Sequence, residues 1–184
     1  TPHKDTVLLT AIDKDRTMIS LIFSIFNSFG SGVSSEKYGI LFHNRGAGFN
    51  LKEGHPNEIC GKKRPLHTII PAFLQEKNHF IMPFGVMGGQ YQANGHARLI
   101  SNLIHHKMDI QSAIDFPRSF PENGFLNLES GYSGEISSKL EKIGHKVLRA
   151  DQPIGGAQAI IHDLKTNILI GGSDPRKDGC ALGY

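Results

Sequence analysis

The stretch DTVLLTAIDKD, residues 5–15, decides how the start of this chain folds. Its apolar and β-branched residues run up to a polar cluster at 13–16 that is typical of a turn, and a second apolar run follows at 18–25. Two such runs joined by a short turn predict a pair of strands. Thr6 stands at the head of the first strand, where a threonine is either an ordinary strand residue or a nucleophile.

The remaining sequence predicts strands, then helices, then strands again. Helices are expected where apolar residues recur at helical spacing, with Pro117 ending the second helix, Ser133 capping the third and Gly144 ending it. This order predicts an α+β layered domain rather than a doubly wound sheet. The further strands are expected at 39–42, 69–74, 80–87, 146–150, 157–162 and 168–171, and the first two helices at 95–105 and 110–116.

Composition places the chain among ordinary folded proteins and excludes some classes of partner. The 184 residues, 39% hydrophobic and 20% charged, are enough for one domain with a core. A net charge of +3, with one basic cluster at 62–64, gives no reason to expect nucleic acid. The longest loop, 46–60, is rich in Gly, Asn and Pro and is the best place for a site.

Cysteine and histidine usage argues against a disulfide framework and against a metal centre. Cys60 and Cys180 are far apart, and the ten histidines show no metal-ligand spacing, so we expect no metal and no cofactor. No apolar run reaches the length of a membrane span, and we expect no membrane partner. The compartment stays open, with the cytoplasm favoured over the periplasm or secretion because no disulfide is expected.

A threonine hydroxyl becomes a useful nucleophile only beside a base, and the simplest base is the α-amine of a threonine that begins the chain. Such chemistry also needs backbone N–H groups that stabilise an oxyanion. Gly88 and Gly89 follow a predicted strand and precede a helix, which suits this task, although a glycine pair there is more often only a turn.

Six short motifs occur in the order found in γ-glutamyltranspeptidases, and the chain resembles the small subunit of that family over nearly its whole length. The resemblance implies the αββα four-layer sandwich of N-terminal nucleophile hydrolases, with residues 1–184 as the small-subunit part of one domain. It also implies a precursor that cleaves itself. The motifs are 6–15, FGSG at 29–32, KRPL at 63–66, GVMGG at 85–89, AIDFPR at 113–118 and GSDPR at 172–176.

The resemblance assigns roles position by position. Thr6 corresponds to the nucleophile because its distance from FGSG matches the family. Thr1 is an alternative nucleophile only because it stands first in the sequence. Ser24 corresponds to a hydroxyl residue that orients the nucleophile, although an ordinary strand serine would look the same. Gly88 and Gly89 correspond to the oxyanion glycines.

The sequence departs from the family pattern where the donor's amino-acid end is bound. Gly48 stands in place of the aspartate that holds the α-amino group, His67 and Thr68 replace the serine pair that grips the α-carboxylate, and Phe26 replaces an asparagine. The sequences RGAGF at 45–49 and HTIIPAF at 67–73 resemble the γ-glutamyltransferase-like or cephalosporin-acylase-like branch of the family. Arg45 is then expected to bind a carboxylate of a glutaryl or similar acid, unless it is an ordinary surface arginine.

Two function classes follow. The first is an amide hydrolase or acyl transferase in which Thr6, exposed by self-cleavage, attacks a γ-glutamyl or glutaryl-type amide. The second is an inactive relative that serves as a scaffold or interaction subunit. In both, the resemblance implies a large subunit from the same precursor as partner, in a heterodimer or a dimer of heterodimers, and in the first a small-molecule amide is the substrate.

Overall fold

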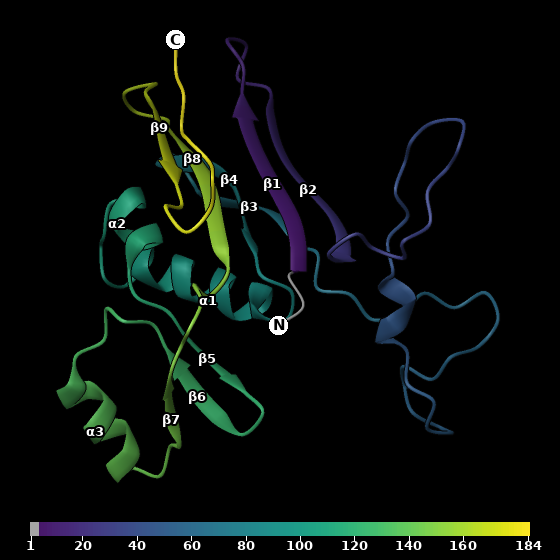
Figure 1. The fold of residues 1–184 in the computed structure, drawn as a ribbon. Coiled ribbons are helices and arrows are strands. Elements are labelled where there is room, and N and C mark those ends of the chain that lie inside the picture. The colour runs from purple at the N-terminus through teal and green to yellow at the C-terminus, as the bar shows by residue number, and fades with distance from the viewer. Residues whose placement is uncertain (1–3) are drawn as a thin grey trace.

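A computed structural model describes residues 4–184 of the chain and shows a mixed α+β fold with three sheets (Figure 1). The first sheet is a hairpin, the second has four antiparallel strands in the order β3-β4-β8-β9, and the third is small, in the order β5-β6-β7. The elements are β1 (Lys4–Ile12), β2 (Met18–Asn27), η1 (Arg45–Gly48), β3 (Pro71–Glu76), β4 (Phe80–Met87), α1 (Tyr91–Ile104), α2 (Ile110–Asp115), β5 (Ser119–Glu122), β6 (Phe125–Leu128), α3 (Gly134–Lys142), β7 (Val147–Arg149), β8 (Gly156–Asp163) and β9 (Leu169–Ser173).

The four-stranded sheet is covered on both faces, and this places the core. Side chains alternate along a strand, so neighbours on β4 face opposite ways. Phe84 faces α1, where its ring lies 4.9 Å from that of His96, whereas the position of Gly85 faces the hairpin and is contacted by Leu8. The hairpin, the sheet and the helices α1 and α2 therefore form three layers, with the main core between sheet and helices.

The outer face of the β1–β2 hairpin is apolar and uncovered. Val7 pairs with Phe23 and Leu9 with Leu21 across the hairpin, and Val7 and Phe23 are 63% and 66% exposed. These side chains lie opposite Leu8, which is buried against the sheet. A contiguous apolar face of this kind marks a contact surface.

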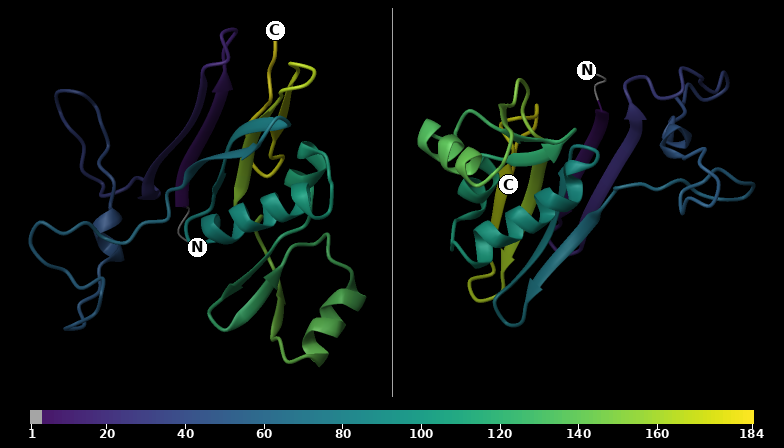
Figure 2. Two further views of the ribbon diagram at one scale, coloured as in Figure 1. Left: turned by 180° about the vertical axis from the view of Figure 1, so that it is seen from behind. Right: turned by 90° about the horizontal axis from the view of Figure 1, so that it is seen from below.

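Residues 28–70 leave the body of the molecule as an irregular arm (Figures 1 and 2). Regular structure in this arm is limited to η1 and two isolated bridges, so the expectation of a loop at 46–60 is confirmed and extends well beyond it. The prediction of a strand at 39–42 is wrong, because within this segment only Leu41 forms a bridge, to Ser34. Gly39 has a φ of 65° in a turn, and an apolar run this short has too few partners to form a ladder.

The small sheet was missed and one predicted strand belongs to it. Asn123 and Gly124, with φ of 54° and 79°, turn the chain between β5 and β6, as an Asn-Gly pair favours. The segment predicted as a returning strand at 146–150 is β7, which pairs in parallel with β6 and does not rejoin the main sheet. The third helix begins as predicted, because Ser133 Oγ accepts a hydrogen bond from the Ile136 backbone nitrogen at 3.3 Å.

Two of the six motifs meet in a buried ion network that ties the small sheet to the core. Arg118, only 5% exposed, pairs with the fully buried Asp174 at 2.5 Å. Arg176 binds Glu129 at 2.7 Å and Asp174 at 3.2 Å. Burial favours the neutral form of Glu129, but hydrogen bonds from Arg176 and from two backbone nitrogens outweigh it, so the pKa of that carboxyl is lowered.

Candidate active site

The hairpin brings Thr6 and Ser24 together from positions 18 residues apart in the sequence. The two residues are partners across the β1–β2 ladder, next to an irregularity in the register between Asp5 and Thr6. Their hydroxyl oxygens share a hydrogen bond of 3.1 Å, and both side chains are half-buried. The structure therefore places the predicted nucleophile and its predicted orienting hydroxyl in direct contact.

Phe26, the second-last residue of β2, has a strained backbone conformation two residues after Ser24. Its φ is 77°, in the left-handed region that a bulky side chain rarely adopts, at a cost of about 1–3 kcal/mol. In this conformation the Phe26 backbone nitrogen donates to Ser24 Oγ at 3.1 Å. Strain of this size is commonly held at functional positions by surrounding contacts.

The contacts that hold Phe26 in this conformation come from Asn44, at the start of η1. Asn44 is tied to the end of β2 in two places, because its side chain accepts from the Asn27 nitrogen at 3.0 Å and its own nitrogen donates to Ile25 at 3.2 Å. Asn44 was not singled out from the sequence, since an asparagine in a loop carries no signal of its partner. Its two contacts fix the residue that follows it, Arg45.

Arg45 reaches from η1 to the hydroxyl pair. Its Nη2 donates to Ser24 Oγ at 2.9 Å, and its guanidinium lies 4.6 Å from the centre of the Phe26 ring. Partial burial lowers the pKa of Arg45, yet an arginine stays protonated in proteins. The positive charge of Arg45 is therefore linked to the hydroxyl of Thr6 through two consecutive hydrogen bonds that share Ser24 Oγ.

Gly88 and Gly89 form the turn between β4 and α1. Their φ values are 127° and 58°, and a Cβ on Gly88 would lie 2.8 Å from the Gly155 Cα, so only glycine fits there. Thr68 supports the turn, since its hydroxyl donates to the Gly89 carbonyl oxygen at 2.7 Å. The start of β1 and the N-terminal end of α1 lie side by side in all views (Figures 1 and 2).

Within residues 4–184, neither Gly48 nor His67 makes a hydrogen bond to Thr6, Ser24 or Arg45. The Gly48 carbonyl accepts from the Asn57 side chain at 2.5 Å, and a Cβ added there would meet only the Leu66 oxygen, at an ordinary 3.6 Å. His67 is exposed and its Nδ1 accepts from the Ile69 nitrogen at 3.3 Å. The one proton of the Thr68 hydroxyl is already given to Gly89, so a carboxylate cannot receive it in this arrangement.

The part of the chain that the structure describes holds no cluster of three or more metal-ligating side chains. It also has no helix that is both long and apolar enough to cross a membrane.

Comparison with known proteins places the whole chain in one family. The family model for Gamma-glutamyltranspeptidase matches residues 1–184. The chain is 33% identical to the Glutathione hydrolase-like YwrD proenzyme of Bacillus subtilis and 33% identical to the Oxamate amidohydrolase proenzyme of Klebsiella pneumoniae. These matches cover 97% and 98% of the chain but only 36% of each relative, so the chain spans about a third of their length.

Solved structures agree with this. A cephalosporin acylase from Bacillus halodurans superposes with a TM-score of 0.88 at 36% identity, over 96% of this chain and 34% of that protein. An acivicin-inhibited γ-glutamyltranspeptidase superposes with a TM-score of 0.83 at 27% identity, over 94% of this chain and 99% of the matched chain. By sequence and by fold, the chain belongs to the γ-glutamyltranspeptidase family and corresponds to its C-terminal, small-subunit region.

Proposed function

We propose that the protein is an amide hydrolase or acyl transferase whose nucleophile is Thr6, exposed by self-cleavage of the Asp5–Thr6 bond. The observation that carries the proposal is the chain of contacts from Thr6 through Ser24 to Arg45. While Thr6 is joined to Asp5 its nitrogen is an amide and cannot accept a proton. Cleavage frees the α-amine that can act as base.

The proposed reaction uses the α-amine of Thr6 as the base and the glycine turn before α1 as the oxyanion site. The α-amine takes the hydroxyl proton of Thr6 as the oxygen attacks the amide carbonyl, and the backbone N–H groups at Gly88 and Gly89 stabilise the oxyanion. The intermediate collapses when the leaving nitrogen takes that proton, which leaves an acyl ester on Thr6. Water or an amine then attacks the ester and restores the threonine.

The acyl group is proposed to carry a carboxylate that pairs with Arg45 and to need no α-amino group. An arginine fork suits a carboxylate, and Arg45 is the positive charge held at the hydroxyl pair. At position 48, glycine offers no acid to hold an ammonium group. Oxamate, named in one relative, has a carboxylate and an amide but no amino group, which is consistent with this class.

The partner is proposed to be a large subunit cut from the same precursor, giving a heterodimer or a dimer of heterodimers. The uncovered apolar face of the β1–β2 hairpin supports this, because Val7, Leu9 and Phe23 would otherwise stay in water. The relatives are named proenzymes and are about three times as long as this chain. A partner on that face would add the fourth layer of an αββα sandwich.

Mass spectrometry of the full-length precursor tests the nucleophile. We expect Thr6→Ala to abolish both self-cleavage and amide hydrolysis, because Thr6 contacts Ser24, and we expect Thr1→Ala to leave both intact. Cleavage that persists in the Thr6→Ala precursor would rule out Thr6. A wild-type precursor that folds but is never cleaved would favour the inactive scaffold instead.

A further inference from the structure

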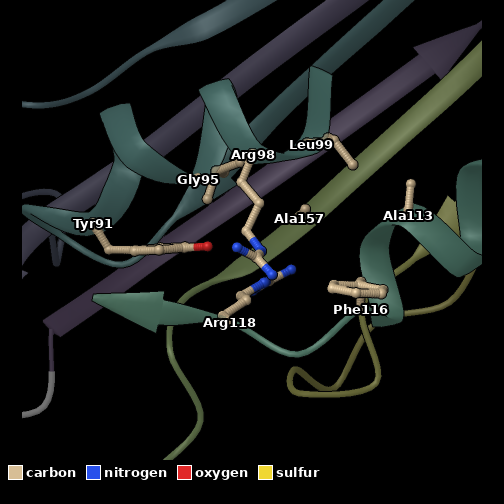
Figure 3. A pocket seen from close by; sticks show the side chains of 9 residues that line it. Tyr91, Gly95, Arg98, Leu99, Ala113, Phe116, Arg118 and Ala157 are labelled. Atoms are coloured by element: carbon tan, nitrogen blue, oxygen red, sulfur yellow. The ribbon is translucent and has the colours of Figure 1, made fainter. Parts of the chain in front are cut away.

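A small cavity lies between the main sheet and the helices (Figure 3). The cavity volume is about 10 Å³, which is about the room that a single water needs. Its apolar lining residues come chiefly from β4, α1, α2 and β8. Its polar side chains are Tyr91 and Arg98 from α1 and Arg118 from the segment after α2.

Two hydrogen-bond donors at this cavity have no partner among the residues that the structure describes. They are the hydroxyl of Tyr91, a residue only 3% exposed, and the Nε of Arg98. Figure 3 shows the Tyr91 hydroxyl and the guanidinium of Arg98 directed at the same space. A buried donor without an acceptor is costly, so a missing acceptor is expected there.

The charge around the cavity is unbalanced. Arg118 is paired with Asp174, and Arg176 with Glu129 and Asp174. Within residues 4–184, Arg98 makes no ion pair, and its Nη2 donates only to neutral oxygens, those of Pro117 and Tyr132, at 2.6 Å each. Arg98 and Arg118 both line the cavity, so two guanidinium groups border the same space (Figure 3).

We propose that this cavity binds one monatomic anion of the chloride class, held by the Tyr91 hydroxyl and Arg98 Nε beside the Arg118 guanidinium. A single ion would accept from both unpartnered donors and offset the unpaired charge of Arg98. Gly95 lines the cavity and lets the Tyr91 ring lie against α1, since a Cβ there would lie 2.7 Å from that ring. The ion would stabilise the start of α1, where the Tyr91 nitrogen donates to the Gly88 carbonyl at 3.1 Å.

The test uses the complete processed protein, purified throughout with bromide in place of chloride and crystallised. We expect an anomalous bromine peak between Tyr91 and Arg98. In chloride-free gluconate buffer of equal ionic strength, we expect Tm to fall by about 2 °C or more relative to chloride. Density that refines as water, with no anomalous peak, would overturn the proposal.

Two variants decide whether any chloride effect on stability arises in this cavity. Tyr91→Phe removes one donor with little change of shape and should abolish the Tm difference between chloride and gluconate. Tyr132→Phe is the matched control, since Tyr132 contacts Arg98 but does not line the cavity, and it should keep the difference. A Tm difference that survives unchanged in Tyr91→Phe would place the halide elsewhere and overturn the proposal.

Discussion

Arg45 donates a 2.9 Å hydrogen bond to the same Ser24 oxygen that contacts the hydroxyl of Thr6. The Phe26 backbone nitrogen donates to that oxygen as well, at 3.1 Å. Ser24 is therefore the point where the first strand, the strained end of the second strand and η1 are held together. Its proposed role is to position the nucleophile.

Replacing Ser24 with alanine should slow acylation at least 10-fold, because Thr6 loses its hydrogen-bond partner and a small misplacement of a nucleophile is costly. Stability should fall by about 1–3 kcal/mol, since two N–H donors lose their acceptor. Single-turnover rates and melting curves measure the two effects separately. Ser24→Thr keeps the hydroxyl and serves as control, and an unchanged acylation rate in Ser24→Ala would make Ser24 an ordinary strand residue.

Substrate preference should follow the charge at position 48. We expect the wild-type enzyme to favour a glutaryl anilide over the matched γ-glutamyl anilide, because burying an unpaired ammonium group costs several kcal/mol. Gly48→Asp should shift kcat/KM toward the γ-glutamyl compound, and the added side chain has space there.

Arg45→Met is the control for the carboxylate end, and it should lower kcat/KM for both anilides about 10- to 100-fold. A wild-type enzyme that strongly prefers the γ-glutamyl anilide would show that an acid from elsewhere holds the ammonium group.

Thr68→Val should reduce kcat about 10-fold while KM stays nearly constant, since the hydroxyl supports the glycine turn through Gly89. The loss of stability should be small, because the Gly89 carbonyl also accepts from the Gln92 nitrogen at 3.2 Å. Thr68→Ser is the control and should behave as wild type. If Thr68 instead bound the substrate carboxylate, KM would rise and kcat would hold, which steady-state kinetics distinguishes.

Glu129→Gln should destabilise the protein by about 3 kcal/mol at neutral pH, because it leaves Arg176 without its carboxylate partner on Glu129. The folded state lowers the pKa of Glu129, so its contribution is complete above the unfolded value near 4.5 and is lost as the pH falls through the folded pKa. The difference in unfolding free energy between wild type and variant should therefore narrow below about pH 4.5.

Denaturant unfolding from pH 7 to pH 3 measures this difference. Glu135→Gln is the control, since it removes only an exposed pair with Lys139 and should cost less than about 1 kcal/mol. Equal stability of the Glu129 and Glu135 variants at pH 7 would contradict the role given to the buried network.

The sequence by itself determined the family, the mixed α+β class and most of the regular elements. Strands 18–25 and 80–87, the helix at 110–116 and the Ser133 cap were all predicted to within two residues at either end. These features depend on side-chain periodicity and on capping residues close in sequence, so a local pattern is sufficient. The family could be inferred because the six motifs are spread along nearly the whole chain and occur in the family's order.

Only the tertiary structure decided what the site residues contact. Arg45 lies 21 residues from Ser24, and Thr68 lies 21 residues from Gly89, so no local pattern could pair them. The strands β5 and β6 were missed because four residues carry little periodicity and Pro121 suits only an edge strand. An arginine or a threonine hydroxyl can serve many acceptors, and which one it meets is fixed by packing between distant segments rather than by its neighbours in the chain.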